Sequence, residues 1–345
     1  MKFLILLLLV VSLTVQPVSA AELTAPTVPE SGSSVMPRAE SFGEGLWQIV
    51  KAAIGLLRPD LKEAAAVCLG VMTAAILASL GQALPGTPKE TADLVGTVAI
   101  GVMLLGSTHS LIHLGTETIT ELSQYGSLLL PVMTAAMAAQ GGFGSSAALY
   151  AGTALFSTLL NWLISGLLIP MVYVFLALSA ANGAVGEDTL KKLGDFVKWL
   201  MTWCLRTILY VFTGYMGITG VVSGTTDAAA LKAAKLTISG VVPVVGGILS
   251  DASEAVLVSA GVVKNSAGIY GIFAILSVCM VPFLRIGVHY LLLKATAAIA
   301  GVLGTKRMAG LVGDFSTAMG FVLAMTGSVC LLLLISTVCF LKGVA

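Results

Sequence analysis

Charged residues are scarce in this sequence. Only 18 Lys and Arg and 17 Asp and Glu occur among the 345 residues, so 10% of the chain is charged. A water-soluble domain carries about 25% charged residues, because its surface must be polar. Hydrophobic residues make up 57%, and the mean hydropathy is +1.00. The composition therefore predicts an integral membrane protein, and a formal net charge of +1 offers no basic field for nucleic acid.

Cysteine pairs and catalytic motifs are also lacking. The five cysteines all fall in apolar stretches, and no two of them form a CxxC pair. Their odd number and their spacing suggest neither a zinc site nor a closed disulfide framework. We expect them to be small buried hydrophobic residues. They are Cys68, Cys204, Cys279, Cys330 and Cys339. Because HExxH and phosphate-loop patterns are missing too, the sequence predicts neither an enzyme nor a bound metal or cofactor.

The first 20 residues have the form of a secretory signal peptide. Lys2 precedes an apolar run, Phe3–Val15, and small residues end at Ala20, where cleavage is expected. An uncleaved anchor is the alternative, and either one starts the mature chain outside the cytoplasm. Residues 21–44 are rich in Pro, Ser and Glu at their start and predict a flexible tether. Residues 45–62 predict an amphipathic helix on the bilayer surface, with packing on a soluble partner as the alternative.

Residues 63–345 predict a polytopic bundle of helices, so the expected fold is all-α. A helix needs about 20 apolar residues to cross the hydrocarbon core of a bilayer. The stretches that qualify are Ala64–Leu84, Leu94–Ile112, Ala147–Ile169 continuing to Ala181, Trp199–Val222, Ser266–Leu293 and Phe315–Leu341.

Lysine and arginine predict the orientation of these spans, because short cytoplasmic loops are enriched in both. With the N-terminus outside, the cytoplasmic loops are Pro85–Asp93, Asn182–Lys198 and Lys294–Asp314, which all carry Lys or Arg. The opposite side receives His113–Tyr125, without Lys or Arg, and Ser223–Lys235, which departs from the bias by holding two lysines.

Two short apolar runs, Gly126–Ala139 and Leu236–Leu249, are interrupted by Gly and Pro. The orientation requires an odd number of crossings both between Gly126 and Ala181 and between Leu236 and Leu293. One span plus a re-entrant half-helix is the preferred interpretation, and three crossings are the alternative. Broken half-helices in membrane transport proteins often surround the binding site.

Proline spacing suggests a weak internal repeat. Pro131 and Pro170 are 39 positions apart, as are Pro243 and Pro282. The proposed units, residues 94–198 and 206–310, each contain a span, a polar loop, a broken half-helix and a long Pro-containing helix. Each unit crosses the membrane an even number of times, so the copies would be parallel. Little identity beyond the prolines supports the repeat, and chance spacing remains the alternative.

The two broken regions supply candidate pathway residues. Ser250 or Asp251 is expected to cap the helix after Pro243, with Glu254 in its first turn; contact with an ion or substrate is the alternative role. Lys264 either extends to the interface or pairs with one of these carboxylates. The full set is Pro131, Gly141, Gly142, Gly144, Pro243, Gly246, Gly247, Ser250, Asp251, Glu254, Lys264 and Asn265.

Four polar residues lie inside predicted spans. Asn161 is expected to hydrogen-bond between helices. For Arg206, Arg285 and His289, extension of the side chain to the interface is favoured over a place in the bundle interior. Gly268 and Gly271 share one helix face and predict close helix packing.

Together these motifs resemble the stage III sporulation protein AE family. The resemblance rests on Leu130–Ala135, Lys232–Lys235, Pro243–Gly247, Leu249–Glu254 and the Lys264-Asn265 pair with Gly268 and Gly271. It covers the chain from about Lys51 to the end and is most specific over Lys232–Gly271.

The resemblance implies a role in endospore formation, in the mother-cell membrane around the forespore. The implied partners are other stage III sporulation A-operon proteins, including a cytoplasmic ATPase and ring-forming membrane proteins, and forespore membrane protein Q. The implied assembly is a trans-envelope channel or feeding apparatus. Three hypotheses follow: a channel subunit, a secondary transporter of a small metabolite or ion, and a scaffold for ring assembly.

Overall fold

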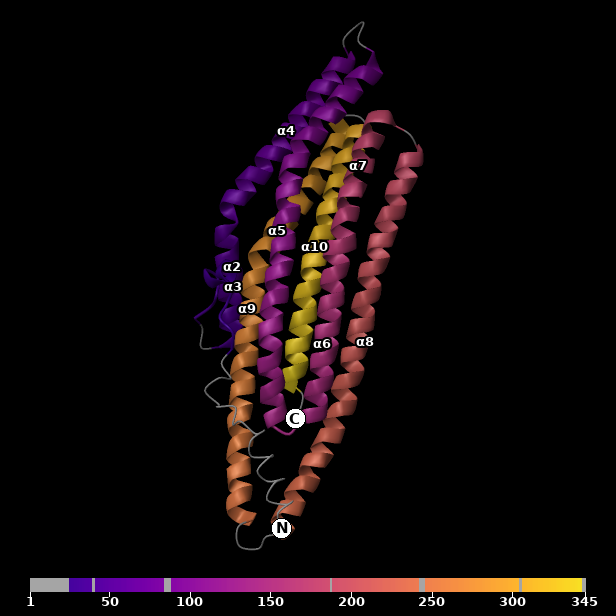
Figure 1. The fold of residues 1–345 in the computed structure, drawn as a ribbon. Helices are drawn as coiled ribbons and strands as arrows, with labels where there is room; N and C mark the ends of the chain where they lie inside the picture. Colours follow the sequence, from indigo (N-terminus) through magenta and orange to yellow (C-terminus); the bar gives the residue numbers. More distant parts are fainter. Residues whose placement is uncertain are drawn as a thin grey trace.

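The computed structural model describes residues 25–38, 41–83, 88–186, 188–241, 246–303 and 306–342. Side chains are described for these residues except 188, 220–264 and 303. Every described element is helical, which confirms the all-α prediction (Figure 1). The elements are α2 (Glu30–Ser33), α3 (Phe42–Leu56), α4 (Arg58–Ala83), α5 (Lys89–Ala139), α6 (Phe143–Leu163), the π-helical turn η2 (Ile164–Leu168), α7 (Ile169–Val185), α8 (Asp188–Val241), α9 (Gly246–Leu303) and α10 (Lys306–Lys342).

Long apolar helices dominate the described chain and establish a multi-pass membrane protein. Five helical stretches are long and apolar enough to cross a bilayer. They are Arg58–Ala83, Lys89–Ala139, Phe143–Val185, Asn265–Val302 and Lys306–Lys342. The sixth predicted span, Trp199–Val222, lies on α8 and runs beyond the residues whose side chains are described.

The C-terminal helix α10 is the centre of the bundle. It contacts α5, α6, α7, α8 and α9, and its residues Phe315 and Phe340 are fully buried. Glycines on neighbouring helices permit this close approach: a Cβ on Gly115 would lie 2.5 Å from Val322, and one on Gly126 would lie 2.6 Å from Leu333. The apolar core is therefore built around α10.

The long helices alternate in direction (Figure 1). As a result, α5, α8 and α10 each begin toward the same end of the bundle, at or near Lys89, Lys191 and Lys306. Three Lys- or Arg-bearing connections thus share one end. The assignment of that end to the cytoplasm stays a prediction.

Helix α5 is continuous, so the predicted polar loop His113–Tyr125 is wrong. All 51 residues from Lys89 to Ala139 are helical, including Pro131, and Gly126–Ala139 is the last part of this helix rather than a separate half-helix. Packing explains the difference. Buried residues recur at helical spacing through the polar stretch, among them Ile119, Leu122 and Tyr125, and tertiary packing of this kind outweighs a local polar composition and an internal proline.

The glycine-rich sequence after α5 forms a tight turn. Gly141 adopts a φ of 95°, in the left-handed region that glycine enters without steric cost. The amide of Gly141 donates to Ala138 O at 2.8 Å, and that of Gly142 donates to Met137 O at 3.2 Å. Gly142 caps α6, and Gly144 lies in its first turn.

The second broken region is described only in part. Pro243 is outside the described residues, and the side chains of Gly246–Lys264 are not described. Helix α9 begins at Gly246, so Ser250 and Asp251 lie inside the helix and do not cap it, which corrects the sequence prediction. The internal repeat stays a prediction.

The segment before the first long helix packs on the bundle. Residues 25–38, predicted to be a flexible tether, include α2, and Val35 is buried. Helix α3 lies against α9, where Ile49 and Ala53 share a small apolar cluster with Phe273. Apolar side chains within a polar composition thus fix this segment. Membrane-surface contact of the exposed face of α3, which carries Trp47, stays a prediction.

Candidate functional site

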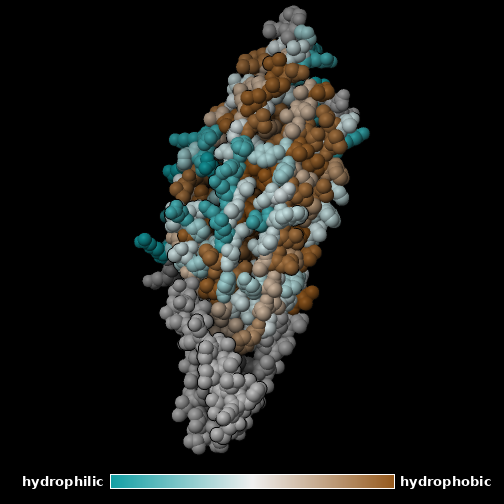
Figure 2. Space-filling view, viewed as in Figure 1, coloured by the Kyte–Doolittle hydropathy of each residue, from teal (hydrophilic) through white to brown (hydrophobic). Residues whose placement is uncertain are grey.

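A polar groove runs between the C-terminal half of α5 and the helix α6. It has a volume of about 550 Å³. We call it the α5–α6 groove, and its lining residues are Thr120, Ser123, Gln124, Ser127 and Leu130 of α5, Tyr150, Ala154, Ser157, Thr158, Asn161 and Trp162 of α6, and Ser165 of η2. Figure 2 shows hydrophilic residues gathered along the middle of the face in view, flanked by hydrophobic ones.

Helical spacing brings the polar side chains to the groove. On α5, residues 120, 123, 124 and 127 follow the three- and four-residue steps that define one helix face. The same steps place Thr158, Asn161 and Ser165 on the facing helix. The two helices are joined by the turn at Gly141, so their adjacent faces meet. A polar stripe on each of two neighbouring helices therefore makes one continuous polar surface.

The π-helical turn η2 lies directly beside the groove. It precedes Pro170, whose ring nitrogen has no hydrogen to donate to a carbonyl one turn earlier. Such π-turns are frequent at functional sites because the wider turn changes the direction of nearby side chains. Here Ser165 Oγ lies 3.5 Å from Asn161 Oδ1, at the edge of the groove.

A smaller polar hollow adjoins the groove on α5. His113, Thr116, Glu117, Thr120 and Glu121 line it. His113 Nδ1 lies 3.3 Å from Glu117 Oε2, with both side chains mostly exposed. Ser31 of α2 donates a hydrogen bond to Glu121. Carboxylates are thus added to the hydroxyl and amide groups of the groove.

The groove is equipped for hydrogen bonding rather than for covalent chemistry. Its polar lining consists of hydroxyl and amide groups, and Ser123 Oγ is buried with no hydrogen-bond partner among the described residues. No cluster of three metal-ligating side chains occurs in the part of the chain that the structure describes. A surface of this kind can hold water or a polar chain.

The candidate residues from the sequence fall in different places. Asn161 lines the groove. Pro131, inside α5, and Gly141, in the turn after it, do not line the groove. Asn265 is exposed on α9. Gly268 and Gly271 confirm the close packing that their spacing predicts, since a Cβ would lie 2.4 Å from Leu341 or 2.7 Å from Leu129.

The ionisable residues within the spans also differ from one another. Arg206 is exposed. Arg285 Nη2 pairs with Asp60 Oδ1 of α4 at 3.1 Å, so this side chain joins two helices. His289 is buried, with its Nδ1 2.9 Å from the Arg285 carbonyl oxygen. The preferred prediction, extension to the interface, is therefore wrong for His289, because its ring is held by its own helix.

Sequence reasoning missed most of the groove. The stretch around Gln124 looked like a loop, and Ser157 and Thr158 were absorbed into an apolar span. A signal was present, since Thr120, Gln124 and Ser127 recur at helical spacing once α5 is continued through Tyr125. The five cysteines, in contrast, are free and buried or half-buried, as expected.

Comparison with known proteins agrees with these features. A family model described as stage III sporulation protein AE matches residues 39–342. Stage III sporulation protein AE of Bacillus subtilis (strain 168) is 23% identical over 218 residues, an alignment that covers 63% of this chain and 55% of that relative. No solved structure matches. The family description refers to a stage of sporulation and not to a reaction. Because the family model covers nearly the whole helical bundle, the chain belongs to the stage III sporulation protein AE family.

Proposed function

We propose that this chain is a membrane subunit of a trans-envelope channel between mother cell and forespore, in which it acts without catalysis. Family membership supports the role in sporulation. The α5–α6 groove carries the rest of the proposal, because a continuous polar surface on an otherwise apolar helical bundle marks either a water-filled path or a contact with protein.

The groove is one wall of a path rather than a closed tube. Gln124, Thr158 and Trp162, which line it, are exposed on the outer surface of the chain. A conduit built on this surface requires a second wall from another subunit. This requirement favours a channel subunit over a secondary transporter that works alone. The implied partners, an ATPase, ring-forming membrane proteins and forespore membrane protein Q, belong to the proposal.

The placement of the protein also belongs to the proposal. The mother-cell membrane around the forespore is the proposed location, with the N-terminus outside the cytoplasm. Asp251 and Glu254 remain proposed pathway residues of α9. Their exchange for Asn and Gln is expected to reduce passage without preventing assembly.

Substitution within the groove tests the proposal. Gln124→Leu with Asn161→Leu keeps side chains of similar size but removes amide groups that contact a hydrated path. We expect the yield of mature spores to fall strongly, while the variant still co-purifies with its partner proteins. The matched control is Thr213→Leu on the exposed face of α8, where the Thr213 hydroxyl donates to the Leu209 carbonyl of its own helix. It is expected to leave both measurements unchanged.

Two results contradict the proposal. Normal spore yield in the groove variant would show that these amides line no essential path. Loss of co-purification in the groove variant, with normal assembly of Thr213→Leu, would identify the groove as an assembly surface and favour the scaffold hypothesis.

A further inference from the structure

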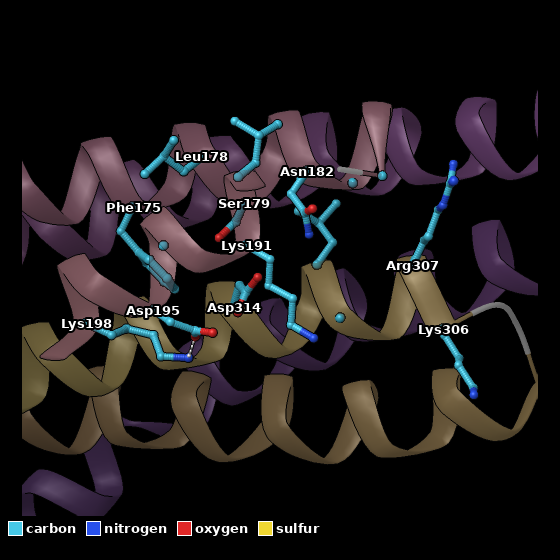
Figure 3. A pocket seen from close by; sticks show the side chains of 16 residues that line it. Phe175, Leu178, Ser179, Asn182, Lys191, Asp195, Lys198, Lys306, Arg307 and Asp314 are labelled. Carbon is cyan, nitrogen blue, oxygen red and sulfur yellow. Dashed lines mark ion pairs between the residues drawn. The ribbon is translucent and has the colours of Figure 1, made fainter. Parts of the chain in front are cut away.

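A second pocket lies near the Lys-rich end of the bundle, where α7, α8 and α10 meet. It has a volume of about 290 Å³. We call it the basic pocket. Four cations line it, Lys191, Lys198, Lys306 and Arg307, together with two carboxylates, Asp195 and Asp314, and the polar side chains of Ser179 and Asn182 (Figure 3). The pocket is separate from the α5–α6 groove and shares no lining residue with it.

Ion pairs leave part of this positive charge unbalanced. Lys198 Nζ lies 3.1 Å from Asp195 Oδ1, and Arg307 Nε lies 3.9 Å from Asp93 Oδ2. Lys191 and Lys306 make no ion pair among the described residues. With Asp93 and Asp314 included, four cations face three carboxylates, so one positive charge is left unbalanced. The pocket therefore favours an anion near the unpaired lysines.

Aromatic residues on α8 place the pocket at a membrane boundary. Phe196, Trp199 and Trp203 are exposed and stack in sequence, with ring centroids 6.0 Å and 6.4 Å apart. They lie where the polar sequence at the start of α8, up to Lys198, is followed by an apolar run. Exposed tryptophans at such a change are typical of the headgroup level of a bilayer. The basic pocket lies on the polar side of this level, beside Lys198.

We propose that the basic pocket binds the phosphate group of an anionic phospholipid. Lysine binds phosphate as a point charge, and basic pockets between membrane helices bind lipid headgroups. Asn182 supplies an amide group on the α7 side of the pocket, where the Ser179 hydroxyl is hydrogen-bonded to Asp314. The exposed aromatic ladder, none of whose residues lines the pocket, marks the depth at which the acyl chains would begin. This inference is independent of the proposed channel.

Lipid titration of the purified full-length chain tests the proposal. The chain is held in neutral detergent and titrated with phosphatidylglycerol or with phosphatidylcholine, and bound lipid is counted by native mass spectrometry. Wild type is expected to retain phosphatidylglycerol in preference. In Lys191→Gln with Lys306→Gln, retention is expected to weaken at least about fivefold, which corresponds to about 1 kcal/mol for one lysine near an anionic surface.

A matched control separates the effect of the pocket lysines from the effect of removing any two positive charges. Lys192→Gln with Lys294→Gln removes the same charge from two exposed lysines outside the pocket, one on each of two helices. It is expected to bind lipid as wild type does. Asp195→Asn removes the ion-pair partner of Lys198 and is expected to strengthen the retention of phosphatidylglycerol. A gain of this kind does not result from misfolding, which could otherwise explain a loss in the glutamine variant.

Three outcomes overturn the proposal. The first is equal retention of the two lipids by wild type. The second is an equal loss of phosphatidylglycerol in the pocket and control variants. The third is competition by inorganic phosphate at millimolar concentration, which would show that the pocket takes free phosphate instead of a lipid headgroup.

Discussion

Single glycines determine how closely α10 approaches its neighbours. A Cβ on Gly115 would lie 2.5 Å from Val322 and 3.5 Å from Ile286, so this position has no room for a side chain. Gly106, on the same helix, has no atom within 4 Å of the corresponding position. The same residue type thus has a packing role at one site and none at the other.

Gly115→Leu is expected to destabilise the protein, with Gly106→Leu as its control. Overpacking of a dense interior typically costs about 1–3 kcal/mol. At Gly106 the added side chain projects outward, and no such loss is expected. Thermal unfolding of both variants in the same detergent measures the difference. Equal midpoints would show that α5 and α10 are farther apart at Gly115 than the structure has them.

Residue identity alone predicted some of these contacts and not others. The spacing of Gly268 and Gly271 predicts close packing, since small residues three or four apart share a helix face. The pairing of Arg285 with Asp60 joins residues more than 200 positions apart. No local pattern encodes such a pair, because it depends on which helices become neighbours.

At the scale of elements, α5 shows what packing adds to sequence. The polar stretch between Ile112 and Gly126 has the composition of a loop, yet one face of it is buried. The existence of apolar helices is predictable from hydropathy, whereas their continuity depends on neighbours that cover every third or fourth residue. The same dependence hid the groove, which exists only where α5 and α6 meet.

Pro131→Ala tests whether the internal proline of α5 only costs stability. Proline inside a helix is about 3 kcal/mol less favourable than alanine. Because α5 continues through Pro131, alanine is expected to raise the free energy of unfolding by up to about 3 kcal/mol in urea titration, with spore yield unchanged. A less stable variant would show that α5 requires the altered geometry that proline imposes.

At the scale of the whole molecule, the alternation of helices predicts which residues share a side of the membrane. On a background without the five cysteines, Lys192→Cys near the start of α8 and Gly144→Cys near the start of α6 lie toward opposite ends. In right-side-out vesicles, an impermeant maleimide is expected to label Gly144→Cys at once and Lys192→Cys only after lysis. Labelling of both before lysis would contradict the orientation derived from lysine and arginine.

The length of α5 has a consequence for the reach of the protein. At about 1.5 Å per residue, its 51 residues form a rod of about 77 Å. The hydrocarbon layer of a bilayer is about 30 Å thick. Even a steeply inclined rod of this size projects well past the lipid, and α6 accompanies it back from Gly141. The hairpin therefore extends beyond the lipid on at least one side of the membrane, where it offers a surface to a neighbour.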